Sequence, residues 1–214
     1  PRFVEEVEDV RQGLGLEQFV LLGHSWGGML AIDYALKYQQ HLRAVVISNM
    51  TAGIQSYLAN IPALKALLSP QNRARLEELE AAQDYDNPDY MRIMMEDAYP
   101  QVICRLQPWP DSIMRSLMHA NQKIYNQMQG KSEFQVTGNL KDWERWDQLH
   151  KITVPTLTIG ARHDTVPFAD LQRMAKLFPN GRNLTCPNGS HMAMWDDQAV
   201  YFDGLLKFLK RLTA

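Results

Sequence analysis

The feature that most constrains the fold of this chain is a short glycine-rich turn between an apolar run and a helical pattern. Residues 19–22 (Phe-Val-Leu-Leu) are apolar without polar alternation, as is typical of a buried parallel strand. Residues 23–28 form the turn, and residues 29–38 then place apolar side chains at helical spacing. A strand that passes directly into a helix predicts a β-α-β unit, because the next parallel strand needs a crossover connection.

Similar strand and helix patterns occur elsewhere along the chain. Further strands are expected at residues 44–48, 154–159 and 182–185, and further helices at residues 3–13, 169–177 and 200–212. Strands that alternate with helices predict the α/β class, with a parallel central sheet.

Residues 55–145 differ from the rest because buried strand patterns are absent there. Helix-like patterns punctuated by prolines cover residues 57–68, 72–82, 89–99 and 112–129. We interpret this segment as an inserted helical cap, so that residues 1–54 and 146–214 form the core. The cap is rich in methionine, which predicts either a pliable apolar pocket or gap-filling between small helices, and we favour gap-filling.

The turn has the pattern Gly-x-Ser-x-Gly, and its place between a strand and a helix makes the pattern specific. The turn consists of Gly23, His24, Ser25, Trp26, Gly27 and Gly28. We predict that Ser25 is a nucleophile on a strained turn, with glycines on either side that leave room for neighbouring backbone. The helix that begins here points N–H groups at Ser25, so the N–H of Trp26 is predicted to stabilise an oxyanion.

A serine nucleophile needs an imidazole base, and the base needs a carboxylate that orients it. Asp164 follows the strand expected at 154–159, and His191 follows the strand expected at 182–185. Both positions lie at the carboxyl ends of parallel strands, where such sheets place their sites. The order serine, acid, histidine therefore predicts a Ser25–His191–Asp164 triad.

Other histidines and acids are weaker candidates for these roles. His24 flanks the serine inside the turn, and His163 precedes Asp164. Asp196 and Asp197 follow His191, which breaks the order serine, acid, histidine.

Composition excludes several classes of protein. The formal net charge is −2 and no basic patch is evident, so we expect no nucleic-acid partner. No apolar stretch approaches the roughly 20 residues that span a bilayer, so we expect no membrane partner. The two cysteines, Cys104 and Cys186, lie in unrelated contexts and are predicted to be buried thiols. No histidine, cysteine and carboxylate cluster has metal-ligand spacing, so neither a metal nor a cofactor is expected.

With these residues placed, the sequence resembles the proline iminopeptidase group of α/β-hydrolases. Residues 23–28 match the turn of that group, tryptophan included. Residues 130–134 and 137–143 resemble the end of its cap, and residues 190–195 resemble its histidine loop. The resemblance covers nearly the whole chain from Phe3 and implies an α/β-hydrolase fold with an inserted helical cap.

The resemblance implies release of an N-terminal residue, often proline, from small peptides or amino-acid amides. The group holds the free amine with carboxylates, and Glu133 matches its cap glutamate. Some members carry a second glutamate directly after the triad aspartate, where this chain has Thr165. Alternatives are therefore a carboxylesterase on neutral acyl esters, or a catalytically weak fragment with a binding role.

The group also has strands before Phe3, including a glycine-rich loop that supplies a second oxyanion N–H. No residue in this chain matches that loop. We expect that the chain is N-terminally incomplete and needs the missing segment for full activity, since one oxyanion donor is worth about 10² to 10³ in turnover. A cytoplasmic location is expected, although a signal peptide would lie in that segment.

Overall fold

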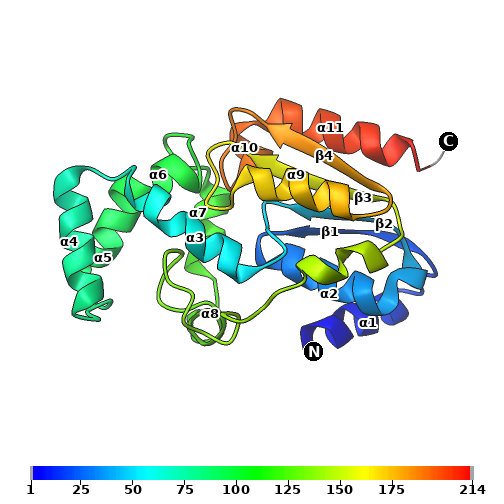
Figure 1. The fold of residues 1–214 in the computed structure, drawn as a ribbon, viewed down its shortest axis with the longest axis horizontal. Helices are drawn as coiled ribbons and strands as arrows, with labels where there is room; N and C mark the ends of the chain where they lie inside the picture. The colour runs from blue at the N-terminus through cyan, green and yellow to red at the C-terminus, as the bar shows by residue number, and fades with distance from the viewer. Residues whose placement is uncertain (1, 213–214) are drawn as a thin grey trace.

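The computed structural model describes residues 2–212, and its centre is a parallel sheet of four strands in the order β1-β2-β3-β4 (Figure 1). The strands are β1 (Phe19–His24), β2 (Leu42–Ser48), β3 (Thr156–Ala161) and β4 (Gly181–Cys186). In the register, Leu22 lies beside Val46 and Val46 lies beside Leu157. The predicted parallel sheet is therefore present.

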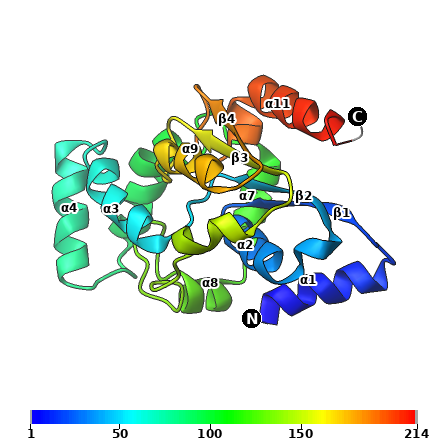
Figure 2. The ribbon, with the colours of Figure 1, turned by 45° about the vertical axis from the view of Figure 1, so that its right-hand side comes forward.

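Helices cover both faces of the sheet (Figure 2). They are α1 (Arg2–Gly13), α2 (Trp26–Tyr38), α9 (Phe168–Leu177), α10 (Ala193–Asp196) and α11 (Gln198–Lys210), with 3₁₀ turns η1 (Gln39–His41) and η3 (Trp146–Lys151). Val45 and Ile47 of β2 point into the core shared with α2 and α9, whereas Ala44 and Val46 point into the core shared with α11. The side chains of β2 therefore alternate between two buried faces.

Strand β1 is less buried than its apolar pattern alone predicts. An apolar run without alternation indicates burial on both faces, but Leu22 is 43% exposed and Phe19 to Leu21 are only partly buried. The reason is position: β1 lies at one edge of the sheet within residues 2–212, and its one strand neighbour is β2.

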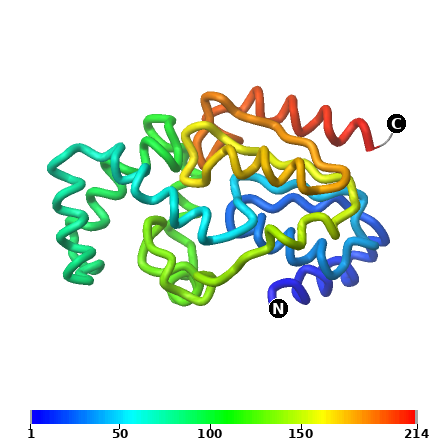
Figure 3. The backbone as a smooth tube through the Cα atoms, viewed as in Figure 1, coloured from blue at the N-terminus to red at the C-terminus, as the bar shows by residue number. Residues whose placement is uncertain are grey.

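A helical layer lies beyond the end of the sheet where the site residues gather (Figures 1 and 3). It consists of α3 (Ile54–Lys65), α4 (Pro70–Ala81), α5 (Pro88–Ile93), the π-helical turn η2 (Met94–Ala98), α6 (Tyr99–Val102), α7 (Asp111–Met118) and α8 (Gln122–Met128). Residues 54–140 hold no strand of the sheet. We call residues 55–145 the cap, a division that stays a prediction.

Two expected cap helices are interrupted. The helix predicted at 89–99 contains the π-helical turn at Met94–Ala98. The helix predicted at 112–129 breaks after Met118, because the Asn121 side chain accepts a hydrogen bond from Ile124 N and so caps a new helix.

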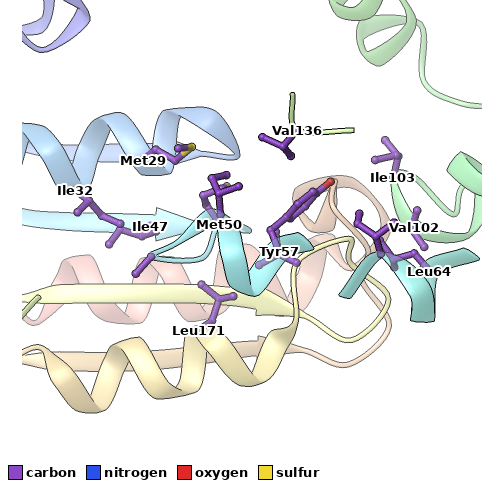
Figure 4. Packing of buried hydrophobic residues seen from close by; sticks show 14 of the residues in the cluster. Met29, Ile32, Ile47, Met50, Tyr57, Leu64, Val102, Ile103, Val136 and Leu171 are labelled. Carbon is purple, nitrogen blue, oxygen red and sulfur yellow. The ribbon is translucent and has the colours of Figure 1, made fainter. Parts of the chain in front are cut away.

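The apolar core runs without interruption from the sheet into the cap. Figure 4 shows packed side chains from Ile47 and Met50 through Tyr57 to Leu64 and Val102, all of them buried. The cap methionines are divided between core and surface: Met94 is fully buried, whereas Met118 is 74% exposed. Cys104 and Cys186 are free and buried, as predicted.

Two features are absent from residues 2–212. None of the helices there has the length and apolar character needed to cross a membrane. No group of three or more histidine, cysteine, aspartate or glutamate side chains is placed to hold a metal ion within that range.

Candidate active site

Ser25 lies on the sharp turn between β1 and α2, with a backbone φ of 54° and ψ of −129°. Non-glycine residues rarely adopt a positive φ, and such strain is held only where the surroundings support it. Here Ser25 N donates to Ser48 O at 3.0 Å, and Gly28 N donates to Ser25 O at 2.7 Å. The turn therefore presents the Ser25 side chain at the carboxyl end of β1.

The glycines around Ser25 differ in how much space they have. A Cβ added to Gly23 would lie 2.0 Å from Gly27 O, and one added to Gly28 would lie 2.8 Å from Met50 Cβ. A Cβ on Gly27 would meet nothing within 4 Å. The close backbone approach predicted for Gly23 therefore exists, and the one predicted for Gly27 does not. Gly28 instead lies close to a side chain.

The structure brings Ser25, His191 and Asp164 into one hydrogen-bonded line. His191 Nε2 lies 2.8 Å from Ser25 Oγ, and His191 Nδ1 lies 2.7 Å from Asp164 Oδ1. Asp164 follows β3 and His191 follows β4, and both side chains are buried. The arrangement can pass a proton between the serine and the imidazole, with the carboxylate holding the imidazole tautomer.

Asp164 is held in place by groups that sequence reasoning missed. Asn49 Nδ2 donates to Asp164 Oδ2 at 2.7 Å, and Val166 N donates to Asp164 Oδ1 at 3.2 Å. Asn49 follows β2, so its place at the carboxyl end of a parallel strand was the available signal. Ser48 Oγ donates to Asn49 Oδ1 at 2.9 Å and accepts from Tyr201 OH at 3.0 Å.

The two histidines at the site have opposite pKa shifts. Burial by itself lowers the pKa of His191, but the charge and hydrogen bond of Asp164 outweigh burial, so that the pKa is raised above 6.5. Burial, together with the nearby His191, lowers the pKa of His24 to about 4. His24 Nε2 lies 2.8 Å from the main-chain oxygen of His191. Because a carbonyl only accepts, Nε2 carries the proton and neutral His24 donates it.

Trp26 is the first residue of α2. Its N–H therefore belongs to the first turn, where N–H groups have no partner within the helix. This end of a helix favours negative charge. The Trp26 indole packs edge-on against Phe3, with ring centroids 4.9 Å apart.

A cavity of about 300 Å³ opens beside Ser25 and His191, between core and cap. Its apolar lining includes Phe3, Trp26, Met29 and Met50 from the core and Ile124 and Met128 from the cap. Met128 is thus a cap methionine that reaches the cavity. A space of this size and lining suits a small, largely apolar group.

Glu133 lies in the wall of the same cavity and is the one carboxylate among the lining residues that the structure describes. Tyr125 OH donates to Glu133 Oε1 at 2.7 Å, and Tyr57 OH donates to Glu133 O at 2.6 Å. Burial, followed by the charge of Glu133, raises the pKa of both phenols. Both phenols therefore stay protonated at neutral pH and hold Glu133 at the cavity.

Thr165 is buried and is not among the residues that line the cavity. Its hydroxyl donates to Asp164 Oδ1 at 3.2 Å, and its carbonyl accepts from Asn60 Nδ2 at 2.9 Å. This position therefore supports the carboxylate of Asp164 and gives the cavity no second negative charge.

The weaker candidates His163, Asp196 and Asp197 lie near the site but do not hydrogen-bond to Ser25, His191 or Asp164 through their side chains in the described residues. His163 N donates to Gly189 O at 3.0 Å. Asp197 accepts from Asn188 N, and Asp196 accepts from Ser190 N, each at 3.0 Å. Both carboxylates thus hold the loop that carries His191.

The fold and this site are those of an α/β-hydrolase, and comparison with known proteins agrees. The family described as "alpha/beta hydrolase fold" matches residues 1–198. A proline iminopeptidase of Elizabethkingia meningoseptica is 46% identical over 213 residues, which are 98% of this chain and 72% of that protein. The chain belongs to the proline iminopeptidase family of α/β-hydrolases, and it is a hydrolase.

Solved structures give the same result. The crystal structure of VinJ has a TM-score of 0.92 and 32% identity, over 98% of this chain and 72% of VinJ. The crystal structure of a proline iminopeptidase of Mycobacterium smegmatis has a TM-score of 0.88 and 32% identity, over 98% of this chain and 71% of that one.

Proposed function

We propose that this hydrolase releases N-terminal residues, proline above all, from small peptides or amino-acid amides by acyl transfer through Ser25, His191 and Asp164. The observation that carries the proposal is the hydrogen-bonded line of these three side chains beside a cavity with Glu133 in its wall. The name of the relatives, proline iminopeptidase, supports the choice of substrate.

In the first half of the reaction, His191 Nε2 takes the Ser25 proton while Ser25 Oγ attacks the scissile carbonyl. The oxyanion forms at the first turn of α2, where the N–H of Trp26 stabilises it. His191 then gives the proton to the leaving amine, and the C–N bond breaks. The N-terminal residue is left as an ester on Ser25.

In the second half, water replaces the leaving amine. His191 takes a proton from the water as it attacks the ester, and then returns the proton to Ser25 Oγ. The free amino acid leaves. Throughout both halves, Asp164 stabilises the imidazolium form of His191, consistent with the raised pKa of that histidine.

Glu133 is proposed to bind the ammonium of the substrate. The residue to be released would place its side chain in the apolar cavity and its charged nitrogen against the Glu133 carboxylate. Tyr125 donates to the Glu133 carboxylate and Tyr57 donates to the Glu133 main-chain oxygen. Both bonds hold the residue in place, which reduces the cost of orienting it on binding.

The test is Glu133→Gln, with the exposed cap residue Glu77 changed to Gln as the matched control. We expect kcat/KM for a free prolyl anilide to fall by about 10² or more, since removing one partner of a buried charge pair costs 2–5 kcal/mol. Turnover of a short-chain p-nitrophenyl ester should change little. Equal losses on both substrates would reject the role of Glu133.

A second candidate function, a carboxylesterase on neutral acyl esters, rests on the character of the cavity. Its lining is mostly apolar, and Thr165 adds no charge to it. The same pair of substrates decides between the two functions: an esterase would turn over the ester much faster than the prolyl anilide, and Glu133→Gln would leave its activity on both substrates unchanged.

A further inference from the structure

The loop that carries His191 is hydrogen-bonded to the cap through its backbone. His191 N donates to Val102 O at 2.9 Å, and Met192 N donates to Ile103 O at 2.8 Å. Val102 is the last residue of α6, so the accepting carbonyls belong to the cap and the donors to the core. The general base of the proposed reaction is thus joined directly to the cap.

Side chains reinforce this junction, and Asp196 is at its centre. Asp196 Oδ1 accepts from Ser190 N and Asp196 Oδ2 accepts from Arg105 N, each at 3.0 Å. The Ser190 hydroxyl contacts the Asp196 carboxylate and lies 2.8 Å from Ile103 O. One carboxylate therefore joins the residue before His191 to the cap segment.

Arg105 adds a bond from the opposite direction. Its side chain Nη1 donates to Asn188 O at 2.7 Å, three residues before His191. Its side chain is exposed, so it adds little to the apolar core. Arg105 and Asp196 thus form reciprocal links, one from a cap side chain to the loop and one from a core side chain to the cap.

We propose that Arg105 and Asp196 are positioning residues for catalysis: they clamp the cap to the histidine loop and so set the distance between His191 and Ser25. The inference rests on the proposed function, in which His191 is the base. His191 must stay within hydrogen-bond reach of both Ser25 and Asp164, and a displacement of about 1 Å can cost about 10² in rate. A loosened clamp lets the loop shift without altering any residue that touches substrate.

A small serine-directed probe separates this role from substrate binding by the cap. A sulfonyl fluoride needs an activated Ser25 Oγ, but it does not need the ammonium site at Glu133. We would measure its reaction rate with the wild type, Arg105→Ala, Arg105→Lys and Asp196→Asn. Arg115→Ala, an exposed arginine elsewhere in the cap, is the matched control.

We expect Arg105→Ala and Asp196→Asn to slow the labelling of Ser25 about tenfold and to lower kcat by a similar factor, with KM changed less than about twofold. Arg105→Lys should restore most of the rate, because a lysine can still donate to Asn188 O. Arg115→Ala should label as the wild type does. The melting temperature of Arg105→Ala should stay near that of the wild type, because the side chain is exposed.

Labelling of Arg105→Ala and Asp196→Asn at the wild-type rate would overturn the clamp, and a higher KM would then assign these residues to substrate binding. Failure of the probe to label the wild type at Ser25 is a different result. It would reject the proposed function itself, and the clamp with it.

Discussion

The side chain of Asn49 donates a 2.7 Å hydrogen bond to the carboxylate oxygen of Asp164 that does not face His191. Asn49 is fully buried and has a left-handed backbone, with φ of 53°. A second bond from Asn49 Nδ2 reaches Ser190 O at 3.2 Å. Asn49 thus connects Asp164 with the loop that carries His191.

Replacement of Asn49 tests whether this bond supports catalysis. Asn49→Gly removes the amide and fits a positive φ, whereas Asn49→Ala removes the amide and strains the backbone. We expect both to lower kcat by about 10- to 100-fold, by analogy with the range seen for hydrogen-bond partners that orient metal-ligating side chains. Melting temperatures should separate the variants, with Asn49→Gly the more stable. A wild-type kcat for Asn49→Gly would show that the amide bond is dispensable.

The glycines of the turn give a matched pair of substitutions. Gly23→Ala places a Cβ 2.0 Å from Gly27 O, so the backbone of the turn must shift. We expect a loss of activity of about 10² or more, since catalytic geometry is sensitive to shifts of about 1 Å. Gly27→Ala meets nothing within 4 Å and lies in the first turn of α2, where alanine is up to about 1 kcal/mol better than glycine. It should keep its activity and melt at a slightly higher temperature.

The pH dependence of kcat/KM should report His191. The base acts when neutral, so kcat/KM should rise as pH increases through the pKa of His191, which lies above 6.5. Asp164→Asn removes the charge that raises this pKa, and should move the acid limb to lower pH while reducing kcat by about 10⁴. His24, with a pKa of about 4, does not titrate in this range. An acid limb unmoved by Asp164→Asn would contradict the assignment.

Stability should depend on Glu8, which joins α1 to α2. Its carboxylate accepts from Arg11 at 2.7 Å, from Gln12 at 2.9 Å and from Tyr34 at 2.8 Å. The bonds from Arg11 and Gln12 lower the pKa of Glu8 most, and the pKa lies well below 4.5.

A carboxyl group whose pKa is lower in the folded state than in the unfolded state stabilises the fold at pH values above its unfolded pKa. This stabilisation is lost as the pH falls toward the folded pKa. Glu8→Gln should therefore lower the melting temperature at pH 7, and the difference from the wild type should shrink as pH falls below about 4. Glu6→Gln is the control, because Glu6 pairs with the exposed Arg2 on the same helix. A pH-independent difference would contradict the role of the charge.

The sheet could be predicted from the sequence because its apolar runs are short and bounded by turns. The observed strand ends differ from the predicted ones by a few residues. The strand expected at 154–159 begins at Thr156, the first residue that pairs with β2. Pro155 before it accepts from Val45 N but has no N–H to donate. The exposure of β1 does not follow from its apolar pattern, because strand order depends on tertiary pairing and apolar character alone does not identify an edge.

The arrangement of Ser25, Asp164 and His191 could be predicted because chain order and strand ends locate these residues. Asn49 could be placed at a strand end from the sequence, but its bond to Asp164 could not be predicted, because that bond depends on which strand ends are neighbours. The contacts of Asp196 could not be predicted either, because they depend on where the cap meets the histidine loop. Neither relationship is local in sequence.

The most direct test of the central claim compares kcat/KM for a free prolyl anilide with that for its N-acetylated analogue, with Ser25→Ala as the blank. We predict that the free amine is preferred by about 10²-fold, because acetylation removes the charge that Glu133 binds, and that Ser25→Ala has lost nearly all activity. Equal or faster turnover of the acetylated substrate would contradict this prediction and would show that the site hydrolyses the anilide without binding a free amine.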